Sequence, residues 1–540
     1  MIKEICNSNL RRHFSTKIRT LRRSVLSKVK VDHNNHCYGG KVQMCPFYES
    51  WFDLKAQPYW RSVGSRLDVE ERIHEFFKPL PEPCNTMYSC LDEVFDYLNR
   101  FILRDILPLS TTKASDCLPR DTSPGFPYAV VDPGVKKGPL ISEIVSDYKR
   151  LVRPKRGFKF MEPCTAGLRL ALAKKPRNKP RLVWVYPAVV QLAEAKFFIP
   201  IYSLLYRCRM FAWDFSFLRG EFFELRKWLG GSATMYGADV SSFDATVHSD
   251  IIDYIFSWIK SKFKMNWQQS CEFDAVWEYF KNTPLWYKDE ILLKDRGVPS
   301  GSFFTQLVDS IVNLGYQIFL FRSMYHSRCK RFAHRYELQD DSLARSFFCR
   351  WPSFFRAVSF CRVLGDDSLV GFIRLAFQYN DYRLACHRLA EFGIIIHPEK
   401  GFFRGTDSVM GIPEFLGFQM PTLRCNLKGP LLLKDPDLVA AQCLFPESAE
   451  KHPGLSLARL IGIKWSAGDS YECHAVVDQF FQLFEVRHKD VTPGDLPVEF
   501  KHLFQFVFGR IQIPVDRYPT TQEVINRYRD ISFSRTLMSR

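Results

Sequence analysis

Two adjacent carboxylates, Asp366 and Asp367, follow a glycine in the stretch VLGDDSLVGF, which runs from Val363 to Phe372. The flanks are apolar and rich in strand-forming residues, and Gly365 permits a tight turn, so the stretch predicts a strand–turn–strand with both acids at its tip. Two anions this close repel each other unless a cation lies between them or one is protonated. Taken alone, the stretch fits either a solvated turn or part of a metal site, and the metal site needs a further acid.

Asp239 is the candidate for that further acid. The stretch MYGADVSSFDATVHSDIIDYIF is typical of a strand over Met235–Val240, with Asp239 near its end, followed by a helix over Ser249–Ile259. If that strand lies beside the hairpin, Asp239 and Asp366 converge from separate strands. Such acids suit a two-cation phosphoryl-transfer site, in which the cations lie about 3.5–4 Å apart. Magnesium is the cation that favours ligands made only of oxygen.

A glycine-rich loop leads into an amphipathic helix in the stretch RGVPSGSFFTQLVDSIVNLGYQIF. The helix is expected to begin at Thr305, and Asp309 and Asn313 follow at intervals of four, so the three side chains share one face. A polar face at the end of such a loop could bind a ribose. The alternative is that Ser300 or Ser302 merely caps the helix.

Five basic residues crowd the proline-interrupted stretch LALAKKPRNKPRLVWVYP, which is typical of a hairpin. They are Lys174, Lys175, Arg177, Lys179 and Arg181. Such a group can grip a triphosphate, because guanidinium and ammonium groups neutralise the charge that develops on leaving pyrophosphate. The alternative is an ordinary solvated charged face.

The bulk composition indicates a globular, multi-subdomain chain with a polyanionic partner. It has 540 residues, 46% of them hydrophobic, and a formal net charge of +17. Residues 1–30 carry nine Lys or Arg and one acid, so we expect a basic arm. The sixteen cysteines lie in a chain without a secretory signal, which predicts reduced thiols. The most apolar stretch, AVVQLAEAKFFIPIYSLL, is interrupted by Gln191, Glu194 and Lys196, so no membrane span is expected.

Seven stretches, taken in order, resemble the motifs of viral RNA-dependent RNA polymerases. TSPGFPY (Thr122–Tyr128) resembles motif G, KKPRNKPRL motif F, DVSSFD motif A, GVPSGSFFTQLVDSIVN motif B, LGDDSLV motif C, FGIIIHPEKGFF motif D and EFLGFQM (Glu414–Met420) motif E. The match spans roughly residues 120 to 420. The motif B phrase is most similar to the polymerases of the partitivirus and picobirnavirus group of double-stranded RNA viruses.

The resemblance implies a role for each matched residue. Asp239, Asp366 and Asp367 would hold two Mg²⁺ ions, for which Mn²⁺ can substitute, and Lys400 would be the general acid to pyrophosphate. Nucleotide and ribose contacts would come from Asp244, Ser300, Gly301, Thr305, Asp309, Asn313, Lys174, Lys175, Lys179 and Arg181. Template and primer contacts would come from Thr122, Ser123, Gly125, Phe415, Leu416 and Gly417. The picornavirus pattern has Asn where this chain has Asp309, so whether Asp309 or Asn313 completes ribose recognition is open.

The resemblance also implies an α+β fold with right-hand architecture, in which the palm is an antiparallel sheet backed by helices. The expected division is a basic extension over 1–75, fingers over 76–192 and 281–298, palm over 193–280 and 299–427, and a thumb with a C-terminal element over 428–540. The implied function is template-directed RNA synthesis that replicates and transcribes a viral, double-stranded RNA genome. The expected partners are RNA and NTPs, with a viral capsid protein as a further candidate, in the host cytoplasm inside the virion.

Two other functions remain as alternatives at this stage. A reverse transcriptase would share the palm, but two residues disfavour it. Those enzymes usually carry a bulky aromatic residue where this chain has Asp244. They also usually carry an aromatic-x-Asp-Asp sequence, whereas Gly365 precedes the two aspartates here. A non-catalytic RNA-binding or capsid-associated protein would account for the net charge and the basic arm, but not for three acids in ordered motifs. The mode of initiation, the host, capsid anchoring and the oligomeric state are left open.

Overall fold

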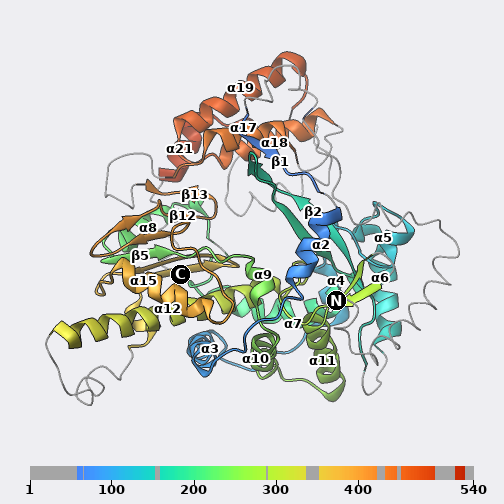
Figure 1. The fold of residues 1–540 in the computed structure, drawn as a ribbon. Helices are drawn as coiled ribbons and strands as arrows, with labels where there is room; N and C mark the ends of the chain where they lie inside the picture. The colour runs from blue at the N-terminus through green and yellow to red at the C-terminus, as the bar shows by residue number, and fades with distance from the viewer. Residues whose placement is uncertain are drawn as a thin grey trace.

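The computed structural model describes residues 45, 57–64, 66–152, 158–213, 215–287, 290–335, 352–421, 432–446, 452–492 and 517–529. The basic arm predicted for residues 1–30 lies outside these ranges. Figure 1 shows sheets on both sides of the molecule, with helices packed around them and a group of C-terminal helices above.

A central sheet of five strands carries the candidate acids. Its order is β11 (Val409–Met410), β10 (Phe402–Arg404), β5 (Thr234–Gly237), β9 (Asp367–Phe372) and β8 (Phe360–Leu364), and all neighbours are antiparallel. The hairpin predicted around the adjacent aspartates is confirmed, because Leu364 lies opposite Asp367 and leaves Gly365 and Asp366 as a two-residue turn. Gly365 has a φ of 61°, a left-handed conformation that glycine adopts without steric cost.

This sheet is buried on both faces, which fixes its register. On one face Tyr236 and Val370 belong to the core beneath α12 (Thr305–Arg335) and α15 (Tyr379–Ala390). On the other face Met235 and Leu369 pack into a second core with α8 (Glu221–Gly230). A slip of one residue would exchange the two faces, so the alternating apolar pattern holds β5 and β9 in one alignment.

A second sheet has the order β4 (Pro180–Val185), β2 (Cys164–Leu170), β6 (Pro284–Tyr287) and β7 (Glu290–Leu293), in which β2 and β6 are parallel. The helices of this half of the protein include α3 (Asn85–Leu98), α6 (Lys137–Leu151), α7 (Ala188–Leu205), α10 (Ser249–Lys260) and α11 (Trp267–Lys281). The other short elements are α2 (Arg66–Glu75), η2 (Asn99–Phe101), α4 (Thr111–Asp116), α5 (Tyr128–Val131), β3 (Leu172–Lys174), η3 (Phe217–Arg219), α9 (Phe243–Thr246), α14 (Phe354–Ala357), β12 (Glu414–Phe415) and β13 (Phe418–Gln419). The helix predicted from Ser249 is confirmed as α10.

Helix α7 is the apolar stretch considered above as a membrane span. By length and composition it could cross a bilayer, yet 67% of it is buried inside the protein. Two of the residues that interrupt it, Glu194 and Lys196, are buried, and Lys196 Nζ pairs with Glu272 at 2.6 Å. The helix therefore has the burial of a core helix in this fold.

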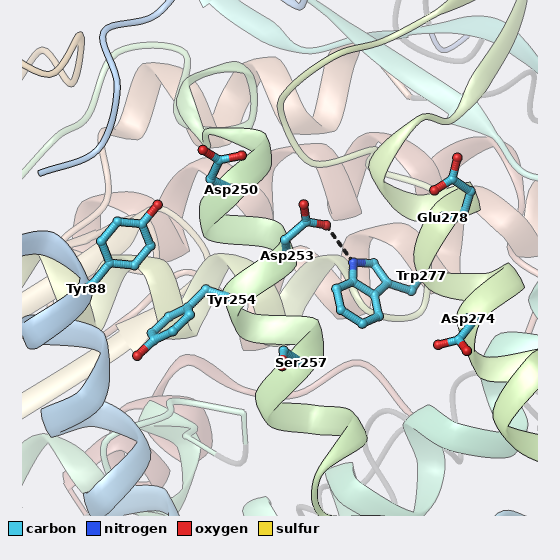
Figure 2. A pocket seen from close by; sticks show the side chains of 8 residues that line it. All are labelled: Tyr88, Asp250, Asp253, Tyr254, Ser257, Asp274, Trp277 and Glu278. Atoms are coloured by element: carbon cyan, nitrogen blue, oxygen red, sulfur yellow. Dashed lines mark hydrogen bonds between the residues drawn. The ribbon is translucent and has the colours of Figure 1, made fainter. Parts of the chain in front are cut away.

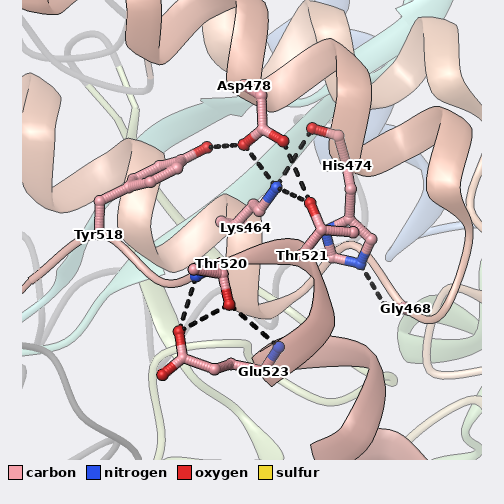
Figure 3. Close-up of polar contacts among 8 residues, drawn as sticks. All are labelled: Lys464, Gly468, His474, Asp478, Tyr518, Thr520, Thr521 and Glu523. Atoms are coloured by element: carbon pink, nitrogen blue, oxygen red, sulfur yellow. Dashed lines mark hydrogen bonds and ion pairs between the residues drawn. The ribbon is translucent and has the colours of Figure 1, made fainter.

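The C-terminal helices α17 (Pro436–Leu444), α18 (Pro453–Trp465), α19 (Tyr471–Arg487) and α21 (Thr521–Arg529) form a unit with its own polar centre. Lys464 Nζ, whose side chain is fully buried, donates to Asp478 Oδ1 at 2.5 Å and to Thr521 Oγ1 at 2.8 Å (Figure 3). Tyr518 donates to the same Asp478 oxygen at 2.8 Å. Helix α21 is thus held on α18 and α19.

Strand β1 (Tyr59–Arg61) joins this helical unit to the rest of the protein. It pairs with β3, and Tyr59 Oη donates to Asp435 at 2.7 Å. Arg61 Nε donates to the carbonyl of Phe445 at 3.1 Å, just beyond the end of α17. These contacts fix the spacing between the hairpin of β2 and β4 and the C-terminal helices.

Candidate active site

The central sheet brings the acids of two predicted motifs together. Tyr236 lies opposite Val370, and the Ser368 Oγ lies 3.4 Å from both the nitrogen and the oxygen of Ala238, one residue before Asp239. The pKa of Asp367 is raised to about 6 by burial among protein atoms and by the charges of Asp366, Glu414 and Asp239, although its carboxylate reaches solvent. Asp239 and the hairpin tip therefore share one electrostatic site.

Two further acids face this site from other elements. Asp244 lies on α9, and its pKa is raised to about 6 by burial among protein atoms and by the charge of Asp366, although the residue is exposed to solvent, while Arg181 opposes the shift. Asp309 lies on α12, is only 4% exposed, and its Oδ1 has no hydrogen-bond partner in the described structure. Burial and the charges of Asp244 and Asp366 raise the pKa of Asp309 well above its usual value. The raised pKa favours the protonated form of Asp309, in which the carboxyl group can donate a hydrogen bond.

Asn313, one turn further along α12, has a different set of contacts. Its Nδ2 donates to the carbonyls of Gly365 at 2.7 Å and Asp367 at 3.3 Å, and its Oδ1 accepts from Gln317 at 2.7 Å. Its amide thus supports the backbone of the aspartate turn. Of the two residues left open by the sequence, Asp309 faces Asp244 and Asn313 supports the hairpin.

The donor set at this site fits a divalent cation that prefers oxygen ligands, because it consists of carboxylates. Burial and then the charges of neighbouring acids raise the pKa values of Asp244 and Asp367, and a bound cation would relieve that repulsion. A compact group of potential ligand atoms lies elsewhere in the protein. Within the described part of the chain, the group of three whose ligand atoms all lie within 4.8 Å of one another is Glu82, His248 and Asp250. Asp239, Asp366 and Asp367 do not form such a group.

The compact group lies beside a surface hollow on α3, α10 and α11, with a volume of about 640 Å³. Figure 2 shows its lining acids and the hydrogen bond from Trp277 Nε1 to Asp253, which measures 2.8 Å. Asp253 also pairs with Lys281, Asp274 with Lys260 and Glu278 with Lys159. Asp253, Asp274 and Glu278 are thus paired with lysines, and none of the acids that line the hollow belongs to the predicted site.

The predicted phosphate-binding residues lie on the hairpin between β2 and β4. Lys174, Lys175 and Lys179 are exposed in or beside its connecting loop, and Arg181 lies on β4. Arg181 reaches the acids, since its charge acts on both Asp244 and Asp367.

Lys400 lies in the turn before β10, where its backbone nitrogen donates to His397 O at 3.0 Å. The next residue, Gly401, packs so closely that an added Cβ would lie 2.5 Å from the Gly237 oxygen and 4.0 Å from the Asp239 nitrogen. The turn that carries Lys400 therefore lies beside Asp239.

The predicted template and primer residues lie in two other places. Leu416 and Gly417, with φ of 52° and 74°, form the turn between β12 and β13, and Phe415 is buried. Thr122 Oγ1 accepts from Lys137 Nζ at 2.7 Å, and Ser123 Oγ accepts from the nitrogen of Gly125 at 3.2 Å. At Gly125 an added Cβ would lie 2.4 Å from the Tyr186 oxygen, so this loop packs on the segment that follows β4.

Four arginines line a pocket of about 460 Å³ between the second sheet and the C-terminal helices. Arg61, Arg169 and Arg181 come from the strands and Arg459 from α18, and of these only Arg181 was predicted from the sequence. Arg169 lies directly opposite Arg181 in the pairing of β2 and β4. Like charges in that arrangement destabilise a sheet, which favours an anionic ligand. The sequence predicts a hairpin here, but not the register of its strands that sets Arg169 opposite Arg181.

The chain resembles known proteins over most of its length. A family model described as viral RNA-dependent RNA polymerase matches residues 85–423, more than half of the chain. The chain is 29% identical over 447 residues to the RNA-directed RNA polymerase of Cryptosporidium parvum virus 1 (strain KSU-1). The aligned region covers 77% of this chain and 76% of that protein.

Solved structures show the same fold at low identity. The insertion-loop deletion mutant of the RNA-dependent RNA polymerase of a human picobirnavirus matches with a TM-score of 0.61 at 14% identity, over 97% of each chain. The 3Dpol RNA-dependent RNA polymerase of a sicinivirus matches with a TM-score of 0.58 at 13% identity, over 88% of this chain and 97% of that one. The fold class predicted from the sequence is confirmed by these likenesses.

Proposed function

The chain belongs to the viral RNA-dependent RNA polymerases, and from that premise we propose that Asp239, Asp366 and Asp367 are the acids that hold two divalent cations for nucleotidyl transfer. One observation carries this assignment. The charges of Asp366 and Asp239 both act on Asp367 across the β5–β9 pairing, although the two motifs lie more than a hundred residues apart. Family membership also sets aside the non-catalytic alternative.

The chain's own residues have distinct parts in the proposed reaction. Bound Mg²⁺ would promote attack of the RNA 3′-hydroxyl on the α-phosphate of the NTP and stabilise the charge on pyrophosphate. Arg181 holds the phosphates. Its guanidinium is close enough to Asp244 and Asp367 for its charge to lower the pKa values of both, and it can bind a phosphate beside them. Lys400, beside Asp239, gives its proton to the leaving pyrophosphate oxygen.

Ribose selection falls to Asp244 and Asp309 in this proposal. A hydroxyl is both donor and acceptor, so a carboxylate at Asp244 can accept from the 2′-hydroxyl while a neutral Asp309 donates to it. Ser300 and Thr305 are assigned to the same ribose site, and Thr305 Oγ1 donates to the carbonyls of Pro299 at 2.7 Å and Ser302 at 2.9 Å. Gly301 leaves the room that the loop needs beside β4.

We further assign the predicted fingers, palm and thumb boundaries to this fold. The second sheet falls largely in 76–192 with 281–298, the central sheet in 193–280 with 299–427, and the C-terminal helices in 428–540. Thr122, Ser123 and Gly125 are proposed to guide the template, and Phe415, Leu416 and Gly417 to support the primer end. By analogy with its relatives, the protein replicates and transcribes a double-stranded RNA genome in the host cytoplasm inside the virion, with a capsid protein as candidate partner.

The test is RNA synthesis by the purified full-length chain on a short RNA template with labelled NTPs and Mg²⁺. We expect a product complementary to the template, and no product when the divalent cation is chelated. Replacing NTPs by dNTPs should nearly abolish incorporation, because the ribose site binds the 2′-hydroxyl. Absence of synthesis with Mg²⁺ and with Mn²⁺, both with and without an RNA primer, would contradict the proposal.

The pocket lined by arginines gives a separate prediction. Arg169→Gln should raise the KM for NTPs by about tenfold, because it removes a charge-assisted contact to phosphate beside Arg181. Arg374→Gln, in an exposed position after β9, is the matched control and should leave the KM unchanged. Steady-state incorporation at varied NTP concentration measures both. Equal KM values for the two variants would remove Arg169 from the nucleotide path.

A further inference from the structure

The motif B loop, residues Ser300 to Phe303, lies along one continuous segment of the chain, residues 181–194, here named the supporting segment. Ser300 Oγ accepts from the nitrogen of Trp184 at 3.2 Å and lies 3.5 Å from the oxygen of Leu182. A Cβ added to Gly301 would lie 1.9 Å from the oxygen of Trp184, so no larger residue fits there without a backbone shift. Strand β4 thus sets the position of the first half of the loop.

Helix α7 continues the supporting segment and fixes the second half of the loop. Gln191 Nε2 donates to the oxygen of Gly301 at 2.9 Å. Ser302 Oγ lies 2.6 Å from Glu194 Oε1, and the nitrogen of Phe303 donates to Glu194 Oε2 at 2.9 Å. Gln191 and Glu194, two of the polar residues that interrupt the apolar sequence of α7, therefore both bind this loop.

Glu194 lowers the stability of the fold at this position, because it is a buried acid without a cation beside it among the described residues. Its side chain is fully buried, and burial raises its pKa to about 8, although the bonds from Ser302 and Phe303 oppose the shift. The titratable groups that act on it or feel its charge in the described structure are Tyr186 and Cys164, whose own pKa values are raised by burial, so both are neutral. The nearby cation of α7, Lys196, pairs with Glu272 instead. Burying an acid without a cation costs stability, which favours a role beyond packing.

We propose that Glu194 is a positioning residue for nucleotide selection: with Gln191 it holds the motif B loop so that Ser300 and Thr305 meet the ribose, while the same supporting segment carries Arg181 to the phosphates. This inference rests on the proposed role of the motif B loop. It adds a coupling between ribose and phosphate recognition, because residues 181–194 contact the motif B loop and also include Arg181. Glu194 itself touches neither substrate nor cation.

Glu194→Ala and Glu194→Gln separate positioning from packing. The alanine variant leaves Ser302 and the Phe303 N–H without their partner, so kcat/KM for NTPs should fall about tenfold or more, with most of the change in KM. The glutamine variant keeps the shape, since its oxygen can accept from Phe303 and its NH₂ can donate to Ser302. It should restore the KM to within about threefold of the parent value. Incorporation is measured per active molecule, counted by titration of the RNA-bound enzyme.

Glu272→Ala is the matched control, because Glu272 is also a buried partner of α7 but has no contact with the loop. It should lower thermal stability and leave the NTP KM unchanged. If Glu194→Ala folds poorly, Ser302→Ala removes the same bond from the loop side and should raise the KM in the same direction. An unchanged KM in both Glu194→Ala and Ser302→Ala would overturn the inference, whereas inactive parent protein would instead overturn the proposed function.

The pH dependence of stability provides an independent readout. The folded-state pKa of about 8 exceeds the ordinary value of 4.5, so the stabilisation from the neutral acid is complete below pH 4.5 and is lost as the pH rises to 8. The melting temperature of the parent protein should therefore fall relative to that of Glu194→Gln across this window. Melting temperatures that change in parallel from pH 5 to pH 8 would show that Glu194 does not titrate in this way.

Discussion

Asp366→Asn and Asp239→Asn should each lower NTP incorporation by on the order of a thousandfold while leaving RNA affinity within about twofold. Each change keeps the size of the side chain but removes the negative charge that would bind a cation. The acids lie on separate strands of one sheet, so both variants should fail at the same step. Single-nucleotide extension of a primed RNA measures the rate, and filter binding in a buffer with chelator measures RNA affinity.

Asp407→Asn is the matched control for these two variants. Asp407 is an exposed acid between β10 and β11 of the same sheet, where its Oδ1 accepts from the nitrogen of Tyr379 at 2.9 Å, a bond that asparagine can keep. Its rate should match that of the parent protein. Incorporation near the parent rate in Asp366→Asn or Asp239→Asn would remove that acid from the proposed site, and weakened RNA binding would show that the change acts on the fold.

The second large effect is expected when the two polar residues of α12 are changed separately. Asp309→Leu should lower the preference for NTPs over dNTPs by about ten- to a hundredfold, because it removes the proposed donor to the 2′-hydroxyl. The same change should raise the melting temperature, since the Asp309 Oδ1 is buried without a partner in the described structure. Competition between a labelled NTP and its dNTP measures the preference.

Asn313→Leu is expected to act differently. It leaves the carbonyls of Gly365 and Asp367 without their donor, at a cost of about 1–3 kcal/mol for a buried unsatisfied group. The turn that carries Asp366 should then be less well ordered, so incorporation of NTPs and dNTPs should fall together by about ten- to a hundredfold. A changed preference in Asn313→Leu, with none in Asp309→Leu, would reverse the two roles.

Local features of the fold follow from the sequence because they depend on neighbours in the chain. The apolar flanks and the glycine of residues 363–372 predict a hairpin, and the interval of four that joins Thr305, Asp309 and Asn313 places them on one helix face. The strand before Asp239 was predicted to extend to Val240, whereas β5 ends at Gly237. Strand ends depend on pairing partners, which lie elsewhere in the chain.

Which elements lie side by side was decided by tertiary structure. The pairing of β5 with β9, which brings Asp239 to the hairpin, depends on two cores that bury opposite faces of one sheet. The pairing of β2 with β4 sets Arg169 opposite Arg181.

The same holds for the polar residues of α12 and α7. The helical interval gives Asp309 and Asn313 the same face, but only the packed structure turns one towards Asp244 and the other towards the aspartate turn. Glu194 was read from the sequence as an interruption of an apolar run, and its partners Ser302 and Phe303 lie more than a hundred residues away. Periodicity determines the side of an element that a residue occupies, whereas the partner on that side is set by non-local packing, for which a single sequence has no local signal.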